Sequence, residues 1–137
     1  MVVADGQGLP VGDRLYSASP GEVTLAEETL KTVSLGKGRR RKKPKRLICD
    51  RAYDSETLRW RLAQRSIELI CPHRRGRKRR RLQDGRSLRR YKRRWKIERL
   101  FAWLGNFRRL TIRYERSPKL FEAFVHIAFI MIVIRHF

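Results

Sequence analysis

The sequence predicts an α/β fold in which helices flank a mixed β-sheet. Short apolar runs bounded by turn residues indicate strands, and longer segments with apolar residues three or four positions apart indicate helices. The order strand, strand, helix, strand, helix, strand, helix, helix is typical of an α/β sandwich. A length of 137 residues fits one domain, or a piece of a larger one.

The N-terminal segment predicts a β-hairpin. Met1–Ala4 is an apolar run, and Leu9–Ser17 is a second candidate strand. The glycine-rich turn Gly6-Gln7-Gly8 separates them, which is the spacing of strands that pair directly.

A short helix is expected next. Pro20-Gly21 ends the second strand, and Thr24 and Glu27 have the spacing of a capping box, so the helix should begin at Thr24 and reach about Val33. A basic loop then covers about residues 36–46.

The middle of the chain predicts a strand, a helix and a further strand. Arg46–Cys49 is short and apolar, as expected for the centre of a sheet. Asp54 or Ser55 should cap a helix that carries Leu58, Trp60 and Leu62, and Ile67–Cys71 should return to the sheet.

The C-terminal half predicts helices. A basic loop at about 73–87 leads into a long helix from Ser87 to Phe107, and Leu110–Tyr114 is expected to be extended. Ser117-Pro118 should start the last helix, with Ser117 as the N-cap. Its apolar run is shorter than the ~20 residues of a membrane span and includes His126, so we expect a buried core helix and no membrane partner.

Charge indicates a polyanionic partner. Lys and Arg number 35 against 13 Asp and Glu, which gives a formal net charge of +22. The basic runs could be solvated loops, but runs of this density favour contact with the DNA backbone. The run before the long helix supplies five candidate phosphate ligands: Arg77, Lys78, Arg79, Arg80 and Arg81.

Cysteine and histidine give no metal motif. Cys49 and Cys71 lie far apart in apolar runs, so we interpret them as reduced core residues of a cytoplasmic protein. His73, His126 and His136 lack metal-ligand spacing and are assigned to core or surface roles.

Three carboxylates are harder to explain by structure alone. Asp5 and Asp50 each end an apolar run, and Glu98 lies inside a basic helical segment. Taken singly, the aspartates could be turn residues and Glu98 could pair with a neighbouring cation. Together, two strand ends and a helix can bring three acids to one point, where they would hold Mg²⁺ or Mn²⁺.

The long helix places further candidates beside Glu98. At about 100° per residue, Tyr91, Arg94, Glu98 and Gly105 fall within roughly 60° of each other. An apolar stripe of Ile97, Phe101 and Leu104 adjoins them, so Glu98 is expected at the border between the packed and open faces. Trp95 lies close to this face and is the candidate for stacking on DNA bases.

These residues resemble a known family. The spacing Tyr91-x2-Arg94-x3-Glu98 resembles the signature of DDE transposases of bacterial insertion sequences, and the segments Val2–Pro10 and Leu47–Asp54 are similar to the segments that carry its first two acids. The family's lysine after the glutamate is replaced here by Gly105, with Asn106 and Arg108 as the nearest polar substitutes.

The resemblance implies a ribonuclease H-like fold over residues 1–137, with Asp5, Asp50 and Glu98 as the catalytic triad. It further implies two Mg²⁺ or Mn²⁺ ions and DNA as substrate, both transposon ends and target. Water would free a 3′-hydroxyl, which would then attack target DNA.

The resemblance also leaves alternatives. No helical DNA-binding region precedes Asp5, so we expect a catalytic fragment or the second of two reading frames, with an N-terminal partner or a second copy of the chain as protein partners. The chain could instead be a non-catalytic basic DNA-binding protein or an inactive remnant of a transposase.

Overall fold

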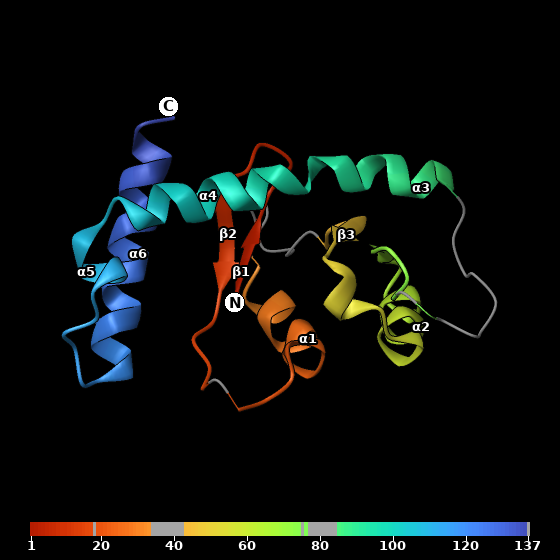
Figure 1. Ribbon diagram of the computed structural model, residues 1–137, viewed down its shortest axis with the longest axis horizontal. Helices are drawn as coiled ribbons and strands as arrows, with labels where there is room; N and C mark the ends of the chain where they lie inside the picture. The colour runs from red at the N-terminus through yellow and green to blue at the C-terminus, as the bar shows by residue number, and fades with distance from the viewer. Residues whose placement is uncertain (18, 34–42, 75, 77–84, 137) are drawn as a thin grey trace. The chain divides into compact units, whose positions relative to one another are not determined.

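The computed structural model describes residues 1–17, 19–33, 43–74, 76 and 85–136 (Figure 1). The chain divides into two compact units. The first comprises Met1–Ser19, Glu27–Ser34 and Lys96–Phe137, and the second comprises Pro20–Ala26 and Leu35–Trp95.

The fold is α/β, as predicted, and the elements follow the expected order. They are β1 (Val2–Ala4), β2 (Pro10–Asp13), α1 (Glu22–Thr32), β3 (Arg46–Ile48), the 3₁₀ segment η1 (Arg51–Tyr53), α2 (Glu56–Gln64), β4 (Glu68–Ile70), α3 (Gly85–Arg89), the 3₁₀ segment η2 (Arg90–Arg94), α4 (Trp95–Gly105), α5 (Arg108–Thr111) and α6 (Pro118–Ile134).

The first unit contains the predicted hairpin. Strands β1 and β2 pair in antiparallel fashion, with Val2 opposite Asp13 and Val3 opposite Gly12. The second strand ends at Asp13 and not at the predicted Ser17, and the N–H of Arg14 after it donates to the carbonyl of Met1.

A small hydrophobic core joins this hairpin to α4 and α6. Its buried residues are Leu9, Leu100 and Ile132. Figure 1 shows α4 beside the strands β1 and β2. The predicted stripe on α4 is wrong at one position, since Leu100 is fully buried whereas Phe101 is 52% exposed. Glu98 lies three residues before Phe101, on the same side of the helix. It therefore lies on the exposed face of α4 and not at the predicted border between the packed and open faces.

The second unit is built on a β–α–β arrangement. Strands β3 and β4 pair in parallel, with Leu47 opposite Leu69, and α2 supplies the crossover that parallel strands require. The buried side chains of this unit include Leu58, Leu62, Ile67, Leu69, Ile70 and Cys71. The expected single mixed sheet is not formed among the described residues, because the hairpin and the parallel pair each have two strands and belong to different units.

Helix α2 has the predicted start and an unusual end. Ser55 is the N-cap, and its hydroxyl accepts a hydrogen bond from the N–H of Leu58. At the other end Ser66 has a φ of 57°, in the left-handed region. The N–H of Ser66 then reaches the carbonyl of Ala63, and that of Ile67 reaches Leu62, which is a Schellman motif.

The predicted start of α1 is wrong by one turn. The helix begins at Glu22, so Thr24 lies inside it. The hydroxyl of Thr24 donates to the carbonyl of Gly21 at 2.7 Å instead of accepting from the helix. The N–H of Thr24 also bonds to Gly21, so the first turn closes before the predicted capping box can act.

The predicted long helix is interrupted. A 3₁₀ segment, Arg90–Arg94, separates α3 from α4. Four of its five residues are Lys or Arg, and like charges one turn apart destabilise an α-helix. The prediction for Leu110–Tyr114 is wrong in part, since Leu110 and Thr111 belong to a short helix, Arg108–Thr111, whereas the backbone of Ile112 is extended.

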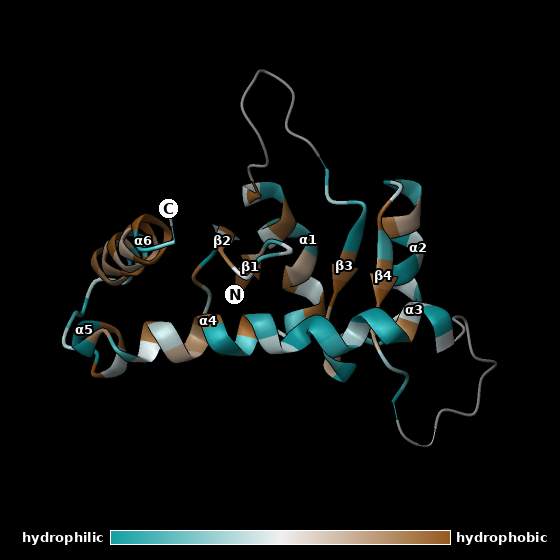
Figure 2. Ribbon diagram, turned by 90° about the horizontal axis from the view of Figure 1, so that it is seen from above, coloured by the Kyte–Doolittle hydropathy of each residue, from teal (hydrophilic) through white to brown (hydrophobic). Residues whose placement is uncertain are grey.

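The last helix begins as predicted, with Ser117 as N-cap and Pro118 in the first turn. Ala128, Phe129 and Ile132 are buried, but Ile127, Ile130 and Ile134 are more than half exposed, so the expectation of a buried core helix holds for one face only. Figure 2 shows apolar residues along much of α6. Among the described residues, no helix has the length and apolarity needed to cross a membrane.

Candidate active site

Asp5 lies where the first strand enters its turn. Its Oδ1 accepts hydrogen bonds from the N–H groups of Gln7, at 2.8 Å, and Leu9, at 2.9 Å. Its own N–H donates to the carbonyl of Leu9. These bonds fix the orientation of the carboxylate and give Asp5 a structural role in the turn.

Two cations of α4 hold this same turn. The ammonium of Lys96 donates to the carbonyl of Gly6, and the guanidinium of Arg99 donates to the carbonyl of Gln7 at 2.6 Å. Lys96 and Arg99 flank Glu98 in the sequence. The structure therefore brings the turn after Asp5 and the helical turn that carries Glu98 together within the first unit.

The sequence interpretation missed Lys96 and Arg99. It treated the cations around Glu98 as partners for that carboxylate or for phosphate. A signal was present in the glycines of the turn, whose backbone can be approached closely by another element. At Gly8 a Cβ atom would lie 2.9 Å from the guanidinium of Arg99.

Asp50 lies in the second unit, directly after β3. It is the N-cap of η1, and its Oδ1 accepts a 2.8 Å hydrogen bond from the N–H of Ala52. Asp50 thus resembles Asp5 in one respect, since backbone N–H groups hold one carboxylate oxygen of each. The Oδ2 atoms of both accept no hydrogen bond within the described ranges.

A buried carboxylate fixes the far end of the same 3₁₀ turn. Asp54 caps η1, and its side chain is only 2% exposed. It accepts from His73 Nδ1 at 2.9 Å, from Arg59 at 3.2 Å and from the N–H of Arg74 at 3.0 Å. Burial raises the pKa of Asp54, but hydrogen bonds from Arg74, His73 and Arg59 outweigh it and lower the pKa to about 2.

The segment after β4 makes hydrogen bonds that hold the turn that carries Asp50. The guanidinium of Arg74 donates to the carbonyl of Ala52 at 2.9 Å. Arg59 reaches from α2 to the carbonyls of Leu69 and Cys71, both at 3.0 Å. The turn that carries Asp50 is therefore held by hydrogen bonds from two other segments of the second unit.

The cysteines are free thiols, as predicted. Cys71 is fully buried and Cys49 is partly buried. Burial raises the pKa of Cys49, and the neighbouring Cys71 and Asp50 raise it further. A thiol of this kind is a weak nucleophile at neutral pH, so Cys49 is not a candidate for chemistry.

The predicted DNA-binding residues are placed in part. The guanidinium of Arg94 lies 5.6 Å from the ring centroid of Tyr91, and Trp95 is 50% exposed. These residues belong to the 3₁₀ segment and its junction with α4, so the predicted α-helical face from Tyr91 to Glu98 is wrong. The candidates Arg77, Lys78, Arg79, Arg80 and Arg81 lie outside the described residues.

Exposed cations continue along the described part of this segment. They are Arg86, Arg89, Arg90, Lys92 and Arg93.

Gly105, at the position of the family's lysine, ends α4, and a Cβ atom added there would meet nothing within 4 Å. Position 105 therefore has space for a side chain but carries no charge.

The residues present suit a hard divalent cation. Asp5, Asp50 and Glu98 offer carboxylate oxygens, the donors that Mg²⁺ and Mn²⁺ prefer. In Asp5 and Asp50, one oxygen is oriented by the backbone, so the second can serve as a ligand without loss of rotamer freedom on binding.

Comparison with known proteins identifies the family. The family model for the transposase DDE domain matches residues 1–134. A curated Burkholderia cepacia protein, assigned as a transposase for the insertion sequence element IS402, is 35% identical over 127 residues. That match covers 90% of this chain and 56% of the relative, so the chain spans about half the relative's length. No solved structure matches the chain. The chain belongs to the transposase DDE domain family.

Proposed function

We propose that this chain is the catalytic domain of an insertion-sequence transposase, which cleaves DNA strands and joins them to target DNA. The family match over residues 1–134 carries the proposal. We assign Asp5, Asp50 and Glu98 as the carboxylates that hold two Mg²⁺ or Mn²⁺ ions on a ribonuclease H-like fold. When bound, such ions supply charge neutralisation at the phosphate and activation of the attacking oxygen.

The chain's own residues would orient the reaction. The carboxylate of Asp50 is held by the N–H of Ala52, and the Asp54 network holds its turn. Glu98 lies on the exposed face of α4, between Lys96 and Arg99, which fix the Asp5 turn to the same helix. These contacts preorient the carboxylates of Asp5 and Asp50, which supports their assignment as metal ligands.

DNA is the proposed substrate because of the charge. The exposed cations from Arg86 to Arg93 and the basic loops at about 36–46 and 73–87 would contact phosphates of transposon ends and target. Phosphate contacts position DNA but do not read its sequence. Recognition of specific ends would therefore need a partner, such as an N-terminal reading frame or a second copy of the chain.

A second candidate function is DNA binding without cleavage, as in an inactive remnant. Two observations favour it. Oδ1 of Asp5 is engaged by two backbone N–H groups of the turn, so Asp5 has a sufficient structural explanation. Gly105 also replaces the family's lysine.

Nicking of supercoiled plasmid in Mg²⁺ or Mn²⁺ separates these functions. We expect weak, sequence-independent nicking that Asp50→Asn and Glu98→Gln abolish. Glu28→Gln is the matched control, because Glu28 is half exposed and pairs only loosely with Arg14, at 3.6 Å. Its nicking should equal that of the unchanged chain.

Asp5→Asn tests the third acid by itself. Loss of nicking with an unchanged melting temperature would assign Asp5 to the triad. Loss of nicking together with a lower melting temperature would assign Asp5 to the turn. Nicking that survives Asp50→Asn in a folded protein would remove the triad, and absence of nicking in the unchanged chain would favour the inactive remnant.

A further inference from the structure

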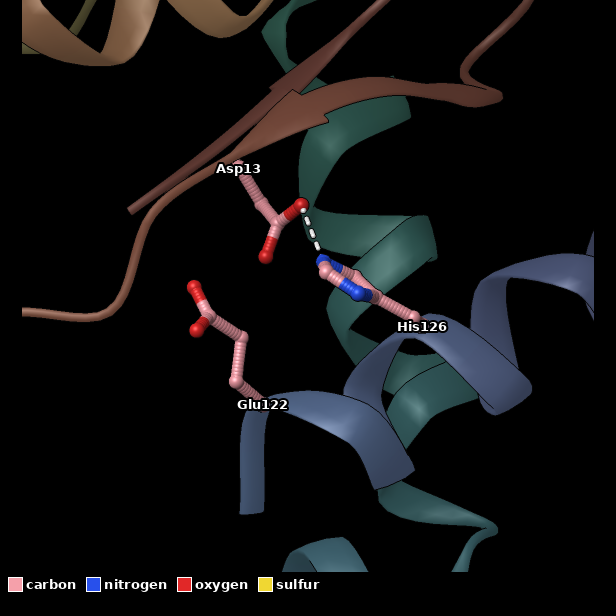
Figure 3. Close-up of side chains that lie close together, drawn as sticks. All are labelled: Asp13, Glu122 and His126. Carbon is pink, nitrogen blue, oxygen red and sulfur yellow. Dashed lines mark hydrogen bonds and ion pairs between the residues drawn. The ribbon is translucent and has the colours of Figure 1, made fainter. Parts of the chain in front are cut away.

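Three potential metal ligands meet in the first unit, away from the proposed triad. Asp13 lies at the end of β2, and Glu122 and His126 lie on α6. One ligand atom from each lies within 4.8 Å of the other two. The three side chains converge from the strand and the helix (Figure 3), and Asp13 Oδ1 lies 3.1 Å from His126 Nε2.

The local structure explains why they meet. Glu122 and His126 are four residues apart on a helix, so they lie one turn apart on the same face. Asp13 is the last residue of β2, where the strand ends beside this face. Two ligands on one helical turn and a third from a separate element form a common metal-binding arrangement.

A cavity of about 550 Å³ adjoins the three residues. Its lining includes Gly12, Thr32 and Phe129 as well as the three potential ligands. The side chain of Asp13 is 14% exposed, whereas that of His126 is 54% exposed. One ligand is thus held by the protein and another is reachable from solvent, and the cavity has room for water to complete a coordination sphere.

We propose that Asp13, Glu122 and His126 bind a divalent transition-metal ion of the Zn²⁺ type. Two carboxylates and an imidazole are a donor set that suits Zn²⁺, whereas Mg²⁺ prefers oxygen ligands alone. Ligands that share one zinc ion lie within about 4.2 Å of each other, twice a bond length of ~2.1 Å. The observed separation of up to 4.8 Å therefore requires only small side-chain adjustments.

The ion would replace the contact between Asp13 and His126. In its absence, His126 Nε2 and Asp13 Oδ1 share a hydrogen bond, and Glu122 lies beside them. With the ion bound, Nε2 and the two carboxylates would all become ligands. The ion would then tie α6 to the end of the hairpin, and so act in stability rather than in strand cleavage.

Zinc titration of the full chain tests the site. The protein is used without a histidine tag and free of nucleic acid, and carries Asp5→Asn, Asp50→Asn and Glu98→Gln so that the proposed catalytic carboxylates do not contribute. We expect one Zn²⁺ per chain and a melting temperature that rises with zinc concentration. His126→Gln and Glu122→Gln should each weaken binding by at least about tenfold.

His136→Gln is the matched control. His136 follows the end of α6, and its Nδ1 contacts the carbonyl of Ile132. This variant should bind zinc as the parent does. Equal zinc affinity in the parent and in folded His126→Gln would overturn the proposal, as would the absence of saturable binding.

Cobalt provides a second measurement on the same parent protein, and it does not depend on the folding of His126→Gln or Glu122→Gln. Co²⁺ bound by Asp13, Glu122 and His126 should show the visible absorption of a nitrogen- and oxygen-ligated ion, and excess Zn²⁺ should displace it. A cobalt spectrum identical to that of the hydrated ion would contradict the site.

Discussion

The ammonium group of Lys96 donates a hydrogen bond to the backbone carbonyl of Gly6, one residue beyond Asp5. Arg99 makes the equivalent bond to Gln7. Two side chains on either side of Glu98 thus donate hydrogen bonds to backbone carbonyls of the hairpin turn. The position of the turn on α4 therefore depends on main-chain shape as well as on charge.

The fit of this turn predicts the effect of a single methyl group. Gly8 has a φ of +92°, and an added Cβ would lie 2.9 Å from Arg99 and 3.3 Å from the backbone of Lys96. We expect Gly8→Ala to lower the free energy of unfolding by about 1–3 kcal/mol, through backbone strain and displacement of α4. Urea unfolding measures the change.

Gly6→Ala is the control for that substitution. An added Cβ at Gly6 meets nothing within 4 Å, and its φ is not in the left-handed region. Its unfolding midpoint should stay close to that of the unchanged chain. An equal decrease in stability in both variants would mean that the turn is sensitive to any substitution, irrespective of its packing on α4.

Asp54 should make the protein sensitive to acid. Its pKa is about 2 in the folded chain, below the value of ~3.9 in an unfolded one. The unfolded chain therefore takes up this proton first, so the stabilisation of about 2 kcal/mol is complete above about pH 5. It is lost as the pH falls through about 4 towards 2.

Comparison with Asp54→Asn isolates this contribution. The variant leaves Arg59 and His73 without a carboxylate partner and should be less stable by about 3 kcal/mol at neutral pH. The stability difference between the two proteins should shrink as the pH falls from 5 to 2. A difference independent of pH would show that the charge of Asp54 is not what stabilises the turn.

Ser66 offers a stabilising substitution. It adopts a φ of 57° at the end of α2, a conformation that costs an L-residue free energy and costs glycine little. Ser66→Gly should raise the free energy of unfolding by about 1 kcal/mol, and Ser66→Val should lower it. A lower melting temperature for the glycine variant would indicate that the hydroxyl has a role of its own.

The basic segments should make DNA affinity depend steeply on salt and little on sequence. Replacing Arg77–Arg81 with neutral residues should reduce the slope of log affinity against log salt by about 0.9 for each phosphate that the protein no longer neutralises. Replacing Arg89, Arg90 and Arg93 tests the neighbouring described cations in the same way. An unchanged slope would show that the altered segment does not touch phosphate.

The sequence predicted the elements better than their junctions. The hairpin, α2 with its Ser55 cap and α6 with Ser117-Pro118 follow from local signals that act over one turn. The break at Arg90–Arg94 was missed, because apolar periodicity continues through it while repulsion between cations does not appear in that pattern.

For the candidate site, the sequence predicted local turn and cap positions but not the contacts between distant residues. The turn and cap positions of Asp5 and Asp50 follow from their places after apolar runs. The Asp54 network joins residues up to 20 positions apart, and no local pattern reports such a contact. In the proposed zinc site, the spacing Glu122-x3-His126 could be recognised in the sequence. The third ligand, Asp13, comes from a strand 109 residues before Glu122 and could not.

Arg59 sets a limit on how this chain can change over evolution. One guanidinium bonds to Asp54, to two backbone carbonyls and to the sulfur of Cys71. A lysine could not replace its planar fork of donors. Loss of Asp54 leaves the guanidinium of Arg59 without its carboxylate, and loss of Arg59 removes one of the donors to the buried Asp54. In diverging relatives that keep this turn, the two positions should therefore change together or not at all.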